Sequence, residues 1–240
     1  NNPKIKALLL CILSGAFLGL SFPPFKTWFF VYPGLMIMLY LVLNAKRFRH
    51  AFGRGYVVML VFNEITLYWI SGWHSDDTFL KVGGVATVIV HSLFMLIPVF
   101  ITYGVSRINK ELALAMFPLI WVGYEYFDNV WQFAFPWLEL GNTETYNLGR
   151  IQIAELAGVH GLTFLICVVS AVLYFVISRV YNKEWKVLSA KTVPLYLLLL
   201  PAFADIVPFS PNSVFFFKTI LIIPELPSGL YFADGFVITS

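Results

Sequence analysis

Apolar stretches of roughly 20 residues, separated by short polar segments, recur along almost the whole chain, and each is long enough to cross a hydrocarbon core of about 30 Å as an α-helix. Seven such spans can be placed, at residues 5–22, 27–43, 51–70, 84–106, 111–127, 151–179 and 192–208. Residues 85–101 and 162–177 are apolar on every face, whereas the strands of a membrane barrel alternate between apolar and polar positions. The pattern therefore predicts an all-α membrane protein, a polytopic helical bundle of about seven transmembrane helices.

The composition agrees with this fold class. Hydrophobic residues make up 59% of the 240 residues and charged residues only 12%, which excludes an ordinary soluble domain. Cys11 and Cys167 both lie deep inside predicted spans. A disulfide bond between them is one interpretation, but buried cysteines are more often small packing residues.

Basic residues mark alternate connections between the spans. Twelve of the sixteen Lys and Arg residues lie before the first span or between spans two and three, four and five, and six and seven. The positive-inside rule then places the amino terminus in the cytoplasm and the end of the seventh span outside. Because these residues lie in connections and not on one folded face, the net charge of +3 does not indicate a nucleic-acid partner.

The character of the chain changes after the seventh span. Between Ser210 and Ser240 a short apolar run, 214–223, is followed by Pro224, Pro227 and Gly229, which is compatible with an external strand and turn. We expect residues 1–209 to form the transmembrane domain. Residues 210–240 are then a short irregular extracytoplasmic tail, or the truncated start of a missing domain.

The connection after the fifth span is unusually long and polar. Residues 133–161 are rich in Pro, Trp, Asn, Thr, Glu and Gly, although a helix pair needs only a few residues to turn. Lipid cannot satisfy an irregular backbone, so this segment must pack on protein or face water. Pro136 and Trp137 can equally have a structural role, in which they shape the loop and anchor it at the membrane interface.

Three carboxylates lie in or beside spans, toward the same side of the membrane. Placing an ionisable group there costs free energy, so each is a candidate functional residue. Glu64, Glu125 and Glu155 can line one wet cavity with His74, His160 or Arg150, or each can reach interfacial water or a hydroxyl. His74, Asp76, His91 and His160 show no metal-ligand spacing, so no metal site is predicted. No nucleophile motif is present, and the sequence indicates no cofactor.

Several motifs resemble one family of membrane enzymes. The chain resembles the membrane domain of bacterial apolipoprotein N-acyltransferases in three successive motifs: FPWL, then GN, and then IQIAELAGVHGLTF at the head of an apolar helix. Three earlier segments agree with this resemblance: LSFPPF after the first span, FGRGYVVMLVFNEITLYWI in the third span and PLIWVGYEYF in the fifth. The resemblance covers about residues 8–180. It implies seven spans, an external nitrilase-like domain and a final span. It also implies acyl transfer from a phospholipid to the amino-terminal amine of a diacylglyceryl-cysteine lipoprotein.

The carboxyl-terminal part departs from that family. In the family a Cys of the nitrilase-like domain, assisted by Glu and Lys, forms a thioester with the acyl chain, but residues 210–240 are few and contain no Cys. No catalytic residue is therefore assigned. We expect a truncated, split or fragmentary member, or a membrane domain without the enzyme, that holds lipid without catalysing.

For such a domain, a side opening between helices would admit a two-chain lipid below Pro136, Trp137 and the turn at Gly158 and Gly161. Headgroups would meet the polar residues of the connection. The expected lipid-binding residues are Glu64, Trp69, Glu125, Pro136, Trp137, Asn142, Glu144, Arg150, Glu155, Gly158, His160 and Gly161. The expected partners are phospholipid, lipoprotein substrates and a separate or downstream nitrilase-like domain. A small-solute transporter using the three carboxylates and a non-catalytic envelope scaffold are the alternatives.

Overall fold

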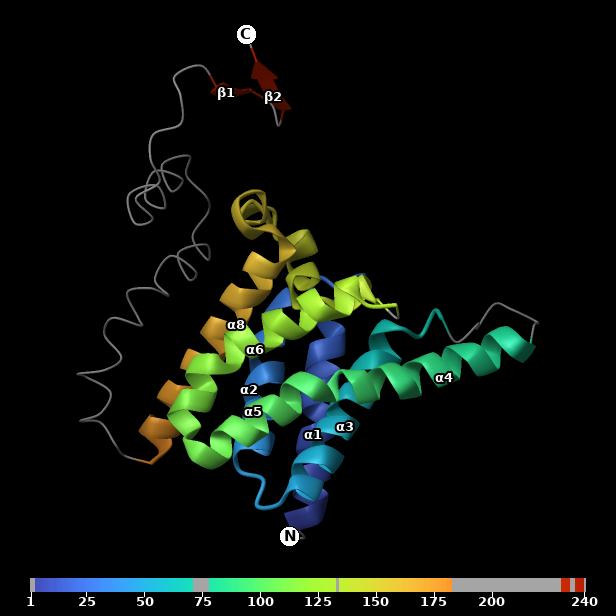
Figure 1. Ribbon diagram of the computed structural model, residues 1–240, viewed down its shortest axis with the longest axis vertical. Helices are drawn as coiled ribbons and strands as arrows, with labels where there is room; N and C mark the ends of the chain where they lie inside the picture. Colours follow the sequence, from blue (N-terminus) through green and yellow to red (C-terminus); the bar gives the residue numbers. More distant parts are fainter. Residues whose placement is uncertain (1–2, 71–77, 133, 183–229, 234–235, 240) are drawn as a thin grey trace. The chain divides into compact units, whose positions relative to one another are not determined.

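The computed structural model describes residues 3–70, 78–132 and 134–182, together with the backbone of 230–233 and 236–239 (Figure 1). The chain divides into two units, Asn1–Ala202 and Phe203–Ser240. The first unit is helical, as the sequence predicts. Its elements in order are α1 Pro3–Leu20, η1 Trp28–Phe30, α2 Val31–Leu43, α3 Phe48–Thr66, α4 Thr78–Phe94, α5 Leu96–Ile108, α6 Lys110–Val130, η2 Pro136–Leu138, η3 Leu140–Tyr146, α7 Leu148–Ile151 and α8 Ala154–Tyr181, where η denotes a 3₁₀ helix.

The second unit contains a short hairpin. Strand β1, Leu230–Ala233, pairs antiparallel with β2, Phe236–Thr239, so that Leu230 lies opposite Thr239 and Ala233 opposite Phe236. The predicted span at 192–208 and the apolar run at 214–223 lie outside the described residues.

Helices in the first unit follow the first six predicted spans. Among the residues that the structure describes, three helical stretches are long and apolar enough to cross a membrane: Pro3–Leu20, Thr78–Ile108, which joins α4 and α5, and Ala154–Tyr181. The number of spans and their orientation stay predictions. One expected single span is divided: α4 ends at Phe94 and α5 begins at Leu96. Pro98 has no N–H to donate to the carbonyl of Phe94, which accounts for the break.

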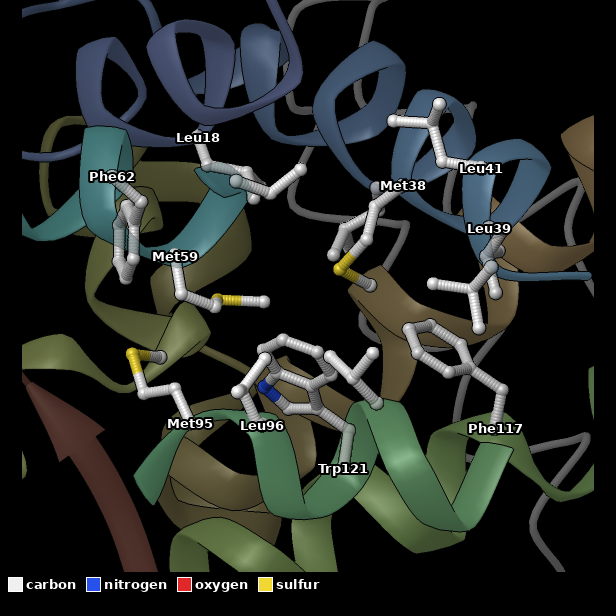
Figure 2. Packing of buried hydrophobic residues seen from close by; sticks show 14 of the residues in the cluster. Leu18, Met38, Leu39, Leu41, Met59, Phe62, Met95, Leu96, Phe117 and Trp121 are labelled. Carbon is white, nitrogen blue, oxygen red and sulfur yellow. The ribbon is translucent and has the colours of Figure 1, made fainter. Parts of the chain in front are cut away.

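Large apolar side chains from five helices meet in the core. Figure 2 shows Leu18 of α1, Met38 of α2, Met59 of α3, Leu96 of α5 and Trp121 of α6 converging there, and each is at most 2% exposed. The α6 and α8 helices also pack against each other, as do α1 and α3 (Figure 1). The end of α6 and the start of α8 therefore lie together, and the connection between them is folded against both helices.

Small residues allow α1 to approach α3 closely. A Cβ added to Gly15 would lie 2.5 Å from the carbonyl oxygen of Val58, and one added to Gly19 would lie 2.6 Å from the Cβ of Ile65. The hydroxyl of Ser14 donates to the carbonyl of Gly34 in α2 at 2.8 Å. The GxxxG pattern thus serves packing within the chain.

Candidate functional site

Two carboxylates of α6 hold the connection that follows this helix. Oε1 of Glu125 accepts hydrogen bonds from the backbone N–H of Leu140 at 2.8 Å and from Nε1 of Trp121 at 3.0 Å. One turn later, Oδ2 of Asp128 accepts from the N–H of Phe135 at 3.2 Å. Both carboxylates are buried, and residues three apart lie on the same face of a helix. They therefore supply the backbone hydrogen bonds that this irregular segment lacks.

Gly141 brings η3 into contact with α8. Its N–H donates to Oγ1 of Thr163 at 2.9 Å. A Cβ at this position would lie 2.5 Å from the carbonyl oxygen of Val159, which is too close for any side chain without movement of the backbone. The segment is thus fixed to α8 as well as to α6.

The predicted turn at Gly158 and Gly161 is present as a kink in α8. Gly158 has φ 67° and ψ −176°, a region that is nearly exclusive to glycine. A Cβ on Gly161 would lie 2.3 Å from the Cβ of Ala157. Both glycines are therefore required by the backbone path that leads from the connection into the helix.

Glu144 and Arg150 form a buried ion pair. Nη2 of Arg150 lies 3.3 Å from Oε1 of Glu144, and both side chains are less than a tenth exposed. Arg150 also donates to the hydroxyl of Tyr32, and its guanidinium lies 5.3 Å from the ring centre of Trp28. These contacts join the connection to η1 and α2, which supports a positioning role for the pair.

A second polar group joins the ends of α6 and α8. Nδ2 of Asn129 donates to Oε1 of Glu139, a buried carboxylate. Nδ1 of His160 lies 4.0 Å from the same oxygen. His160 therefore lies beside Glu139, at the point where the connection enters α8.

A groove opens beside the folded connection, with a volume of about 300 Å³, at the lower end of the range for ligand pockets. It lies between the end of α1, the end of α3 and the η2 and η3 helices. Its lining residues are Phe22, Pro23, Thr66, Leu67, Trp69, Trp137, Leu138, Asn142 and Thr145. It contains three of the expected site residues, Trp69, Trp137 and Asn142.

Two tryptophans from distant parts of the sequence frame the groove. The rings of Trp69 and Trp137 are perpendicular, with centres 6.2 Å apart, and the two residues are 54% and 59% exposed. Nδ2 of Asn142 donates to the carbonyls of Pro136 and Trp137 at 3.1 and 3.3 Å, which holds η2 in place. The groove thus combines an aromatic opening with amide and hydroxyl groups at its edge.

The three span carboxylates have different surroundings. Glu125 lines a small cavity of about 10 Å³ together with His91, Tyr124 and Leu138 of η2. Glu64 and Glu155 are exposed, and neither lines this cavity or the groove. The described residues thus form no cavity that all three carboxylates share, while the exposure of Glu64 and Glu155 agrees with the alternative of contact with interfacial water.

Metal-ligating residues do not gather in the part of the chain that the structure describes: no group of three His, Cys, Asp or Glu side chains there could hold an ion. His74 and Asp76, which were considered as ligands, lie outside that part.

The chain matches a family model, the apolipoprotein N-acyltransferase N-terminal domain, over residues 14–172. The chain belongs to the apolipoprotein N-acyltransferase family. The apolipoprotein N-acyltransferase of Geobacter metallireducens is 35% identical over 206 residues, covering 80% of this chain and 37% of the relative. That of Chlorobaculum tepidum is 34% identical over 166 residues, covering 66% of this chain and 30% of the relative. The chain thus spans about a third of the length of these relatives.

The matched region of the chain contains the whole of the site described above. It extends from α1 into α8 and includes the α6 carboxylates, the ion pair and the groove. Tyr32, Asp128 and Thr163 were not expected as site residues. Asp128 alone had a signal in the sequence, because it stands three residues after Glu125 on a helix.

Proposed function

We propose that this chain is the lipid-holding membrane part of an apolipoprotein N-acyltransferase, and that the groove at Trp69 and Trp137 receives an acyl chain of the phospholipid donor. The groove is the single observation that carries this proposal. Its volume, about 300 Å³, and its aromatic opening suit an apolar chain that enters from the side.

The chemistry of the groove favours an uncharged ligand segment. None of its nine lining residues is charged, while Glu125 and Asp128 accept hydrogen bonds from the backbone of the connection and do not face the groove. A path for a charged solute needs polar or charged groups along it. An acyl chain with its ester region needs apolar walls and a few hydrogen-bonding groups, as Asn142 and Thr145 would provide.

The reaction proposed for the complete enzyme breaks an ester bond of a phospholipid and forms an amide at the amino terminus of a diacylglyceryl-cysteine lipoprotein. Side chains of this chain hold and orient the lipid, and a nitrilase-like domain, as a partner or as a continuation, supplies the nucleophile. Glu125, Asp128 and the Glu144–Arg150 pair act by holding the connection that carries Trp137. No catalytic role is assigned to them.

We also propose that the chain lies in the inner membrane of a bacterium with its amino terminus in the cytoplasm, as the alternation of basic residues favours. Cys11 and Cys167 are both buried, so introduced cysteines can be labelled selectively. In intact cells an impermeant thiol reagent should label T145C and not K46C. The reverse result overturns the orientation.

Photolabelling tests the groove. The 240-residue chain in nanodiscs would be exposed to a phosphatidylethanolamine that carries a diazirine near the end of one acyl chain. We expect crosslinks on Trp69, Trp137 and their neighbours, and a several-fold loss of these crosslinks in W137A. Y126A is the matched control, because Tyr126 is 61% exposed, close to the 59% of Trp137, and does not line the groove. Equal loss in both variants, or labelling spread evenly over the chain, contradicts the groove assignment.

A chimera tests the activity. Residues 14–172 would replace the corresponding region of the Geobacter metallireducens relative, and lipoprotein N-acylation would be measured in a strain that depends on the chimera. We expect acylation above the background of the empty strain, reduced by W137A. A chimera that folds in the membrane and leaves lipoproteins unacylated would falsify the assigned function, even if the groove binds lipid.

A further inference from the structure

The α2–α3 connection and the start of α3 carry a group of positive charges. Lys46, Arg47, Arg49 and Arg54 occur within nine residues that contain no Asp or Glu, and we name these four the basic patch. The first three are exposed. Arg54 is half-buried, with Nη1 donating to the carbonyl of Leu41 at 2.9 Å.

No acidic side chain compensates the basic patch in the part of the chain that the structure describes. The ion pairs found there between carboxylates and Lys or Arg are Glu144–Arg150 and Glu111–Arg179. Glu111 belongs to the same end of the bundle, because its neighbour Lys110 donates to Oδ1 of Asn44 at 3.0 Å. Glu111 is therefore engaged by Arg179, while Lys110 adds a further positive charge at this end.

Two exposed phenylalanines place the basic patch at the boundary of the membrane. Phe48 and Phe52 are 56% and 39% exposed and stand one turn apart on α3. Both rings contact Phe100 of α5, with centres 4.9 and 5.7 Å away. Aromatic side chains beside basic ones are typical of helices at the interface, where the rings enter the acyl region and the cations reach the headgroups.

The basic patch and the groove lie at opposite ends of α3. This helix has 19 residues, with the patch at its start and Thr66 of the groove at its end. At 1.5 Å per residue the separation is about 28 Å, close to the thickness of the hydrocarbon core. A lipid at the patch therefore belongs to the other leaflet and is not the acyl donor in the groove.

We infer that the basic patch binds the headgroup of an anionic phospholipid. Arginine presents paired donors that match phosphate oxygens, and each basic residue near an anionic surface contributes about a fivefold preference. The acyl chains would pack on Phe48 and Phe52, so the ligand is a lipid and not free phosphate. This site is independent of the function proposed for the groove.

Native mass spectrometry tests the inference on the 240-residue chain. The protein would be released from nanodiscs of equal phosphatidylcholine and phosphatidylglycerol, and the retained lipids counted. We expect several-fold enrichment of phosphatidylglycerol, lost in R47Q/R49Q. The charge-retaining R47K/R49K and the control K26Q/K81Q, which removes the same number of exposed charges away from the start of α3, should keep it. Circular dichroism and size-exclusion profiles would confirm that each variant is folded.

Three results would overturn the inference. The first is unchanged enrichment in R47Q/R49Q. The second is an equal loss in K26Q/K81Q, which would mean that total charge is the cause. The third is displacement of phosphatidylglycerol by inorganic phosphate at constant ionic strength, which would identify an anion site without a lipid contribution.

Discussion

Gly141→Ala should open the connection between α6 and α8 without unfolding the bundle. The new Cβ would lie 2.5 Å from the carbonyl oxygen of Val159, whereas carbon–oxygen contacts are normally about 3.3 Å or longer, so η3 must move by about 0.8 Å. This movement breaks the 2.9 Å bond to Thr163 and weakens that of Leu140 to Glu125. Overpacking costs about 1–3 kcal/mol and each lost hydrogen bond about 1 kcal/mol.

Hydrogen exchange measures this effect locally. A loss of at least about 2 kcal/mol predicts that the amide of Leu140 exchanges about 30-fold faster in G141A, since 1.4 kcal/mol is a factor of ten. Peptides of α5 should not change. Gly123→Ala is the control, because a Cβ at Gly123 meets nothing within 4 Å and lies on the same supporting helix, α6. Equal protection of Leu140 in the wild type and G141A would refute the role assigned to the close approach.

Three further predictions concern stability and local order. Gly15→Val should lower the free energy of unfolding in an SDS titration by about 1–3 kcal/mol. Gly104→Ala, where a Cβ has open space, should change this free energy by less than about 1 kcal/mol. Similar losses in the two variants would argue against close packing of α1 on α3. Arg150→Met should lower the free energy of unfolding in the same titration by about 3–5 kcal/mol, because Glu144 would keep a buried charge without its partner. The double variant R150M/E144L should recover most of this loss. No recovery would mean that the pair is not coupled. Glu125→Ala should speed exchange in the η2–η3 peptide by at least about fivefold, while E125Q keeps an acceptor and should preserve protection.

The helical part of the fold could be predicted because it depends on length and hydropathy alone. Six of the seven predicted spans coincide with helices, and the seventh, 192–208, is outside the described residues. The break at Met95 was missed, although Pro98 is visible in the sequence. A proline inside a helix can bend it or divide it, and the packing around it decides which.

The site was only partly predictable. Trp69, Trp137 and Asn142 were expected and do meet at one groove, because polar and aromatic residues of the predicted outer connections gather at one end of the bundle. The sequence left open whether Glu64 and Glu155 share a cavity with Glu125 or reach interfacial water, because hydropathy gives the depth of a residue but not the direction in which its helix face points. Both are exposed. Contacts over long sequence separations, such as that of Tyr32 with Arg150, leave no local pattern.

The buried carboxylates and the groove form one cooperative unit. Glu125, Asp128, Glu139 and Glu144 are all buried in or beside the connection, where a carboxylate is tolerated only with its hydrogen bonds in place. Three of them bind donors on the connection or at the ends of α6 and α8, and the fourth is paired with Arg150. Partial opening would leave several buried carboxyl groups without donors at once, so the connection should open as a whole or not at all. It follows that removing a single anchor will weaken lipid labelling at Trp137, even though none of these carboxylates lines the groove.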